Sequence, residues 1–145
     1  MSAFAPPAES LRVLIADDDL LFAESLMELL SVDSRVEVVG IAANGDQAVA
    51  LAKALRPEVI LMDVNMPVCD GIEAIGRLRD AGVRAKVMIL TGASDIIDAE
   101  EALRAGATAF LRKEEGLDEL RKVFFEVASL TAALGDGIPA PSARY

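Results

Sequence analysis

The 145-residue sequence contains no histidine and only one cysteine, Cys69. Without histidine, the chain cannot build Ser-His-Asp or Cys-His catalysis, a His-ligated zinc site or a histidine general base. A single cysteine cannot form an internal disulfide, which fits a reducing compartment such as the cytoplasm. Any chemistry performed by this chain must therefore use carboxylates, hydroxyls, lysine or a hard metal ion.

Positive charge and long apolar runs are also scarce. Lys and Arg number 14 against 24 Asp and Glu, a formal net charge of −10, which argues against direct nucleic-acid binding. No apolar run approaches the ~20 residues of a membrane span, and the first ten residues do not have the pattern of a signal peptide. With 53% hydrophobic and 26% charged residues, the composition is typical of a globular protein. We therefore expect one soluble, cytoplasmic domain with no membrane partner.

Short apolar runs alternate with segments of helical periodicity along the chain. The runs that predict strands lie at 12–16, 35–43, 59–64, 86–91 and 109–113. Each run precedes a helical pattern, and this alternation predicts a parallel sheet with helices on both faces. Asp46 is the expected N-cap of the second helix, and Gly82 is expected to end the third.

The two ends of the sequence differ in composition from the segment between them. Residues 1–10 and 134–145 are rich in Pro, Gly, Ala and Ser, a composition typical of flexible tails or linkers. We therefore expect an N-terminal tail at 1–10, a folded domain at 11–133, and a C-terminal tail or linker stub at 134–145.

Polar residues follow four of the five predicted strands. Asp17 and Asp18 end the first strand, Asp63 lies near the end of the third, Thr91 ends the fourth and Lys113 ends the fifth. Taken singly, such residues are usually helix caps, turn residues or solvated side chains. In an open parallel sheet, however, ligands bind beyond the carboxyl ends of the strands. Their convergence on that edge predicts a functional site.

Four motifs occur in a specific order at these strand ends: LIADDD, LMDVNMPVCDG, ILTG and AFLRK. On these motifs the sequence resembles the receiver domains of two-component response regulators, over about residues 12–133. The resemblance implies a single flavodoxin-like (βα)5 fold, a doubly wound parallel sheet of strand order 2-1-3-4-5. Glu114, where most receivers carry proline, makes the sequence more similar to NarL-type receivers, which are attached to a helix-turn-helix domain.

The resemblance also implies a function. Asp63 would accept a phosphoryl group from a phosphohistidine on a separate sensor histidine kinase, in a Mg²⁺-dependent reaction, and the acyl phosphate would hydrolyse slowly in the same site. The protein would catalyse its own phosphorylation and dephosphorylation without being a conventional enzyme. We expect the output to be transcription, through a DNA-binding domain that this chain does not contain.

The residue chemistry agrees with a magnesium site. Three carboxylates at one edge repel each other, and a hard divalent cation with oxygen ligands relieves that repulsion. Asp18 and Asp63 are the expected direct ligands, with the Asn65 carbonyl as a third and Asp17 acting mainly through water. Lys113 would supply a point positive charge to Asp63 and to the phosphoryl group, and a hydroxyl at position 91 would bond a phosphoryl oxygen.

The switch is expected to lie between Thr91 and Phe110. In the family, the hydroxyl at the first position moves toward the phosphoryl group and the aromatic at the second rotates inward. The alternative for Phe110 is an ordinary core aromatic. The changed surface would be formed by the fourth helix, the fifth strand and the fifth helix, with Ile96 and Ile97 at the start of that fourth helix. This surface, or another helical face, is a possible homodimer interface.

Two other functional classes, a phosphatase and a pseudo-receiver, fit the sequence less well. An aspartate-nucleophile phosphatase of the haloacid dehalogenase type would need a second acid two residues after Asp63, where this chain has Asn65. A pseudo-receiver, which binds without being phosphorylated, usually lacks one of the acids or the lysine. All of these residues are present here, so the phosphoacceptor hypothesis is favoured.

Overall fold

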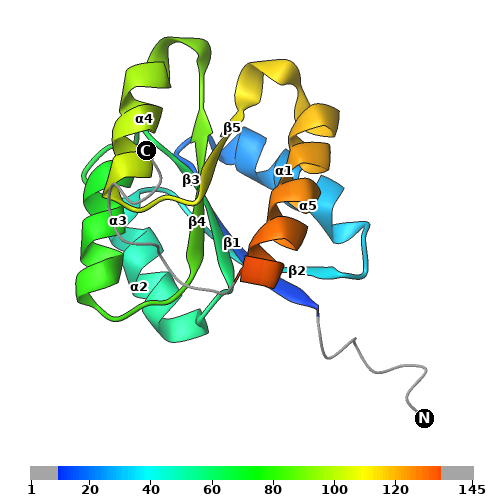
Figure 1. The fold of residues 1–145 in the computed structure, drawn as a ribbon, viewed down its shortest axis with the longest axis horizontal. Coiled ribbons are helices and arrows are strands. Elements are labelled where there is room, and N and C mark those ends of the chain that lie inside the picture. The colour runs from blue at the N-terminus through cyan, green and yellow to red at the C-terminus, as the bar shows by residue number, and fades with distance from the viewer. Residues whose placement is uncertain (1–9, 135–145) are drawn as a thin grey trace.

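The computed structural model describes residues 10–134, in which five strands alternate with five helices (Figure 1). The strands are β1 (Leu11–Ala16), β2 (Val36–Ala42), β3 (Val59–Asp63), β4 (Lys86–Thr91) and β5 (Ala109–Arg112). The helices are α1 (Leu20–Ser31), α2 (Gly45–Leu55), α3 (Gly71–Asp80), α4 (Ile96–Ala105) and α5 (Leu117–Leu134). Except for Ser10 and Leu134, the predicted tails at 1–10 and 134–145 lie outside the described residues.

The strands form one parallel sheet in the order β2-β1-β3-β4-β5, which confirms the predicted topology. The register brings the carboxyl ends of neighbouring strands together. Ala16 of β1 pairs with Met62 of β3, and Asp63 of β3 pairs with Leu90 of β4. The residues that follow β1, β3 and β4 therefore meet at one edge of the sheet.

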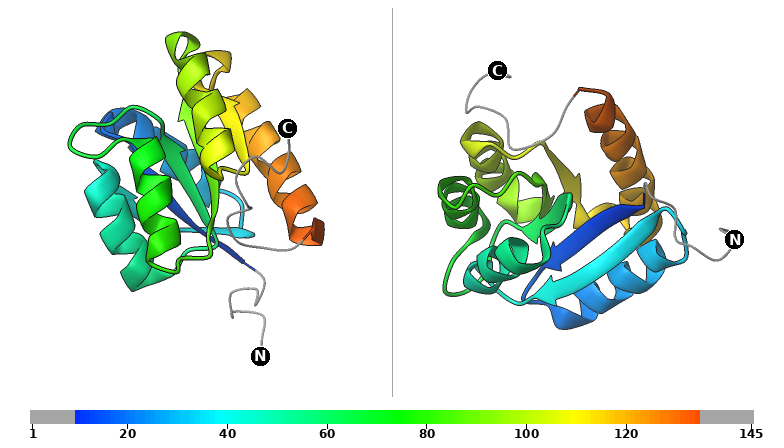
Figure 2. Two further views of the ribbon diagram at one scale, coloured as in Figure 1. Left: turned by 60° about the vertical axis from the view of Figure 1, so that its left-hand side comes forward. Right: turned by 90° about the horizontal axis from the view of Figure 1, so that it is seen from below.

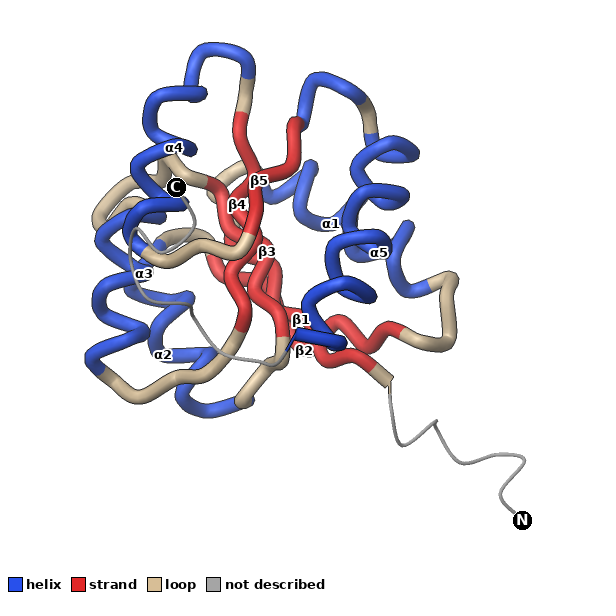
Figure 3. The backbone as a smooth tube through the Cα atoms, in the orientation of Figure 1, coloured by secondary structure: helices blue, strands red, loops and turns tan. Residues whose placement is uncertain are grey.

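Helices cover both faces of the sheet. Figure 1 and Figure 3 show α1 and α5 on one side of the strands and α2, α3 and α4 on the other. In β3, Val59 and Leu61 pack on the α1/α5 side, whereas Ile60 and Met62 pack on the other side. Because successive side chains of a strand point to opposite faces, a strand covered on both faces needs an uninterrupted apolar run, which explains the sequence VILM before Asp63.

The N-cap predicted for α2 is wrong. The helix begins at Gly45, and the cap is Asn44, whose side chain accepts a hydrogen bond from Gln47 N at 2.9 Å. The Gln47 side chain in return accepts one from Ala43 N at 2.8 Å. This pair resembles a capping box, except that Gln47 accepts from the residue before the N-cap rather than from the N-cap itself, and it satisfies two backbone amides. Asp46 instead lies in the first turn, where it pairs with Arg77 of α3.

The end of α3 agrees with the prediction, because Gly82 follows the helix with a φ of 76°. This left-handed conformation favours glycine. No helix within residues 10–134 combines the length and apolarity needed to span a membrane.

Candidate functional site

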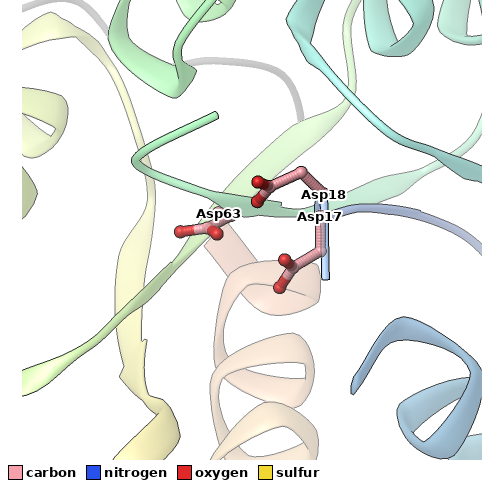
Figure 4. Close-up of side chains that lie close together, drawn as sticks. All are labelled: Asp17, Asp18 and Asp63. Atoms are coloured by element: carbon pink, nitrogen blue, oxygen red, sulfur yellow. The ribbon is translucent and has the colours of Figure 1, made fainter. Parts of the chain in front are cut away.

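Three carboxylates meet where β1 and β3 end. Asp17 and Asp18 directly follow β1, and Asp63 is the last residue of β3. One oxygen from each lies within 4.8 Å of the others, and Figure 4 shows the three carboxyl groups gathered at one place. Asp17 is fully buried and Asp63 is 8% exposed, whereas Asp18 is exposed. The apolar strands therefore hold two acids largely out of water, beside a third that solvent can reach.

The three consecutive aspartates after β1 have different surroundings. Asp17 Oδ1 accepts a hydrogen bond from Asp19 N at 2.9 Å, which closes a local turn. Asp19 is the N-cap of α1, and its side chain accepts from Phe22 N at 3.1 Å. Asp18 has neither of these structural contacts, and its exposed carboxylate remains available to a ligand.

Lys113, immediately after β5, reaches across to this cluster. Its Nζ lies 2.6 Å from Asp17 Oδ2 and 3.3 Å from Asp63 Oδ2. The Asp17 Oδ2 atom is buried, and the Lys113 ammonium is its ionic partner. The ring of Phe22 in α1 lies under the same ammonium, 4.6 Å from its centroid.

These contacts fix the electrostatics of the site. Burial, reinforced by the charge of Asp17, raises the pKa of Asp63 from 3.8 to about 6, although Lys113 and the Asn65 amide act in the opposite direction. Burial lowers the pKa of Lys113, but Asp17 and Asp63 outweigh it, so that the pKa is raised. The ionised cluster holds three carboxylates and one ammonium and so carries a net charge of −2. A divalent cation would balance this charge.

The raised pKa of Asp63 predicts a pH-dependent stability in metal-free protein. Because the folded state binds this proton more tightly than the unfolded state, the contribution of Asp63 to stability falls as pH rises from about 4 to about 6. Asp63→Asn removes this titration. At pH 7.5 in EDTA, the free energy of unfolding of the variant should exceed that of wild type by about 1–3 kcal/mol. Urea unfolding measures this difference. The two proteins should converge near pH 4, and an equal gain at both pH values would contradict this prediction.

The structure also places Asn65 and Thr91 near Asp63. The backbone amide of Asn65 donates to Asp63 Oδ1 at 3.2 Å, while its exposed side chain reaches Asp98 Oδ2 at 3.5 Å. Thr91 lies one residue beyond Leu90, which pairs with Asp63 in the sheet. Its hydroxyl is buried and donates to Gly92 O at 3.1 Å. The role of the Asn65 carbonyl as a metal ligand stays a prediction.

Phe110 lies on the same face of the sheet as Thr91. It pairs with Ile89, two residues before Thr91 in β4, and residues two apart in a strand share a face. Phe110 is half-buried and packs against the core on the α2, α3 and α4 side.

Two glycines hold the loop after β3. Gly71 N donates to Val64 O at 2.9 Å, and a Cβ at position 71 would lie 2.7 Å from the backbone oxygen of Asp63. Gly45 N donates to Cys69 O at 2.9 Å. The Cys69 side chain is buried against Arg77, and burial raises the pKa of its thiol. These contacts join the end of β3 to the start of α2 and α3.

Sequence reasoning missed Phe22 and Asp19. Phe22 fitted the apolar stripe of the first helix, and nothing local distinguishes it from the neighbouring leucines. Asp19 could have been predicted, because an aspartate directly before a helical pattern is a typical N-cap.

The donor set fits a hard divalent cation. It offers carboxylate oxygens without sulfur or imidazole, which suits Mg²⁺, Ca²⁺ or Mn²⁺ better than Zn²⁺. The exposed Asp18 carboxylate agrees with this, since solvent and ions can reach it. Asp17, Asp18 and Asp63 could therefore hold such an ion.

Comparisons with known proteins agree with this geometry. A family model described as "Response regulator receiver domain" matches residues 13–125. The chain is 29% identical to the nitrate/nitrite response regulator protein NarL of Escherichia coli (strain K12), over 90% of this chain and 60% of NarL. It is 35% identical to a protein-glutamate methylesterase/protein-glutamine glutaminase of Vibrio parahaemolyticus, over 92% of this chain and 39% of that protein. The chain thus spans less than two thirds of the length of these curated relatives.

Solved structures give the same result. The signal receiver domain of the putative response regulator NarL from Mycobacterium tuberculosis superposes with a TM-score of 0.76 at 33% identity. That match covers 83% of this chain and 98% of the other. The response regulator domain of Thermotoga maritima CheB superposes with a TM-score of 0.71 at 29% identity, covering 82% of this chain and 94% of that one.

Proposed function

The chain belongs to the response regulator receiver domain family, and we propose that its Asp63 is the phosphoacceptor for a sensor histidine kinase. The observation that carries this proposal is the position of Asp63 at the end of a buried strand, within 4.8 Å of two further carboxylates and 3.3 Å from the Lys113 ammonium. We assign the receiver to residues 11–133. A receiver is a signalling domain, and its enzyme-like activity would be limited to its own phosphorylation and dephosphorylation.

The reaction would be an in-line displacement. An Asp63 carboxylate oxygen attacks the phosphorus, an O–P bond forms, and the P–N bond of the donor phosphohistidine breaks as the imidazole leaves with its electron pair. Lys113 pairs with the Asp63 carboxylate before phosphorylation and would then neutralise the phosphoryl oxygens. Asp18, Asp63 and the Asn65 carbonyl would hold Mg²⁺, with Asp17 acting mainly through water. Bound Mg²⁺ would neutralise the developing charge on the phosphoryl oxygens. Hydrolysis of the acyl phosphate by water would reset the domain.

Thr91 and Phe110 would carry the signal away from the site. The Thr91 hydroxyl now donates to Gly92 O, and it would turn to a phosphoryl oxygen on Asp63. Phe110 would then move further into the sheet face that the two residues share. The surface formed by α4, β5 and α5 would change, and Ile97, which is 74% exposed, lies at its edge. Phosphorylation would bias an existing equilibrium between two conformations.

The surface of α4, β5 and α5 is a candidate interface with an output domain or with a second receiver. Transcription control is the output we favour. The similarity to NarL supports this choice, together with that to the transcriptional regulatory protein LnrK of Bacillus subtilis, which is 34% identical to this chain.

Phosphoryl uptake is the direct test of this function. Incubation with acetyl phosphate and Mg²⁺ should add one phosphoryl group by intact-protein mass spectrometry, and excess EDTA should prevent the addition. An unchanged mass under conditions that label an established receiver would overturn the proposal.

Asp18→Ala should weaken Mg²⁺ binding strongly while the fold is retained. The variant removes one of few carboxylate ligands, but the exposed Asp18 side chain forms no hydrogen bond or ion pair within residues 10–134, unlike the N-cap Asp19. Loss of one charged ligand should lower the affinity by about tenfold or more. Mg²⁺ titration followed by NMR shifts of residues around Asp63 measures the affinity. Glu24→Ala, on the exposed face of α1, is the matched control, and equal affinities of the two variants would mean that the ligand set is wrong.

A further inference from the structure

The edge of the sheet opposite to Asp63 carries a pocket of about 790 Å³. It lies where β1, β3 and β4 begin, because Leu11, Val59 and Lys86 line it, and Figure 2 (right) views the molecule from below, toward this side. The end of α2 and the turn after α3 form its walls. A volume of this size falls within the roughly 300–1,000 Å³ of small-molecule sites. None of the residues proposed for phosphoryl transfer lines it.

The lining of this pocket is cationic although the chain is acidic. Four basic side chains line it, against a single acidic one: Lys53, Arg56, Arg84 and Lys86 against Glu58. Lys53, Arg56 and Lys86 make no ion pair with any other residue in the described range 10–134. Glu58 is already engaged, because its Oε1 accepts a hydrogen bond from Arg12 N at 2.9 Å. The pocket therefore concentrates positive charge, and no ion pair within this range neutralises the charge of these three residues.

Arg56 occupies a position that would suit glycine better. It is the C-cap of α2 in the left-handed conformation, with φ 53° and ψ 60°. Glycine adopts this conformation without the steric cost that a side chain incurs. A residue kept in an unfavourable conformation points to a role for its side chain. The α2 carbonyl groups do not explain the arginine, since Arg12 from β1 donates to Leu55 O and Arg56 O.

We propose that this pocket binds a small phosphorylated organic anion of nucleotide size. The Arg56 guanidinium can bind phosphate oxygens in pairs and stack on a flat ring, whereas the ammonium groups of Lys53 and Lys86 act as point charges. Leu11 and Val83, which are only partly buried, supply apolar contacts for the part of the ligand that carries no charge. The site is separate from Asp63 and does not depend on the phosphoacceptor function.

The test is a calorimetric titration with ADP in EDTA, which removes metal-dependent binding at the acidic cluster. Wild type should bind ADP saturably at one site, inorganic phosphate more weakly, and uncharged adenosine not at all. Lys86→Ala should weaken ADP binding by about tenfold or more, because it removes one of the three cations of the pocket that form no ion pair within residues 10–134. Lys122→Ala, an exposed cation of α5 outside the pocket, is the matched control and should bind as wild type does.

Arg56→Gly separates binding from folding. It removes the guanidinium and relieves the left-handed backbone, so its melting temperature should equal or exceed that of wild type while its ADP affinity falls about tenfold or more. A loss of binding in a more stable protein cannot come from unfolding. The proposal is overturned if neither ADP nor GDP binds saturably, if ADP binds no better than inorganic phosphate, or if binding survives in both Arg56→Gly and Lys86→Ala.

Discussion

Asp63→Asn is expected to abolish phosphoryl uptake from acetyl phosphate, whereas Asp70→Asn, in the same loop, should be labelled as wild type is. The amide nitrogen that replaces one carboxylate oxygen would be no nucleophile, and the remaining amide oxygen carries no charge. The substitution also removes one of the three carboxylates that surround the proposed metal position. Intact-protein mass after incubation with Mg²⁺ measures the result.

Asp70→Asn is a close control because it makes the same chemical change further along the loop. Asp70 is the exposed N-cap of α3, and its side chain accepts a hydrogen bond from Glu73 N at 2.8 Å. Asparagine caps helices about as well as aspartate, so this variant should fold normally. If both variants were labelled, the acceptor would be another residue. If neither variant were labelled, the loss of labelling would come from a disturbed loop rather than from the missing Asp63 carboxylate.

The fold could be predicted from the sequence because local and global patterns agree. Val59 to Met62 read as a buried strand from composition alone, and the structure confirms this, with both sheet faces covered. The strand order came from the resemblance, since periodicity does not say which strands are neighbours. The similarity to NarL-type receivers, predicted from Glu114, is also supported by the relatives with that name.

Details that depend on competition between neighbouring residues could not be predicted. Asn44 and Asp46 both favour an N-cap, and the sequence does not say which one the helix uses. The structure selects Asn44, because Gln47 lies three residues later and bonds both the Asn44 side chain and the preceding amide, and because Asp46 pairs with Arg77 of α3.

Contacts between distant segments could not be predicted either. The sequence placed Lys113 at the correct edge of the sheet, but its shorter contact is with Asp17 at 2.6 Å rather than with Asp63 at 3.3 Å. Its contact with the Phe22 ring depends on how α1 lies beside the end of β5. The pocket at the opposite edge combines α2, the turn after α3 and the starts of three strands, so no single sequence motif predicts it.

Gly71→Ala and Gly76→Ala are expected to change stability in opposite directions, although both lie in α3. A Cβ at position 71 would lie 2.7 Å from the Asp63 backbone oxygen and 3.0 Å from Val64 Cα. These are backbone atoms at the end of β3 and in the loop after it, which cannot rotate away as a flexible side chain does. The free energy of unfolding should therefore fall by about 1–3 kcal/mol.

At Gly76 a Cβ would meet no atom within 4 Å among the described residues, apart from its chain neighbours and the backbone of its own helix. Alanine there should instead raise the free energy of unfolding by about 0.5–1 kcal/mol, because it restricts the unfolded chain within a helical segment. Urea unfolding measures both changes. Relief of the clash at position 71 has to change the distance between the start of α3 and the end of β3. Gly71→Ala should therefore also slow phosphoryl uptake under conditions in which the protein is fully folded. Gly76→Ala should take up the phosphoryl group at the wild-type rate. A Gly71→Ala protein that matched wild type in both stability and rate of uptake would contradict the prediction. It would mean that the close approach of position 71 to the Asp63 backbone does not help to hold Asp63 in position.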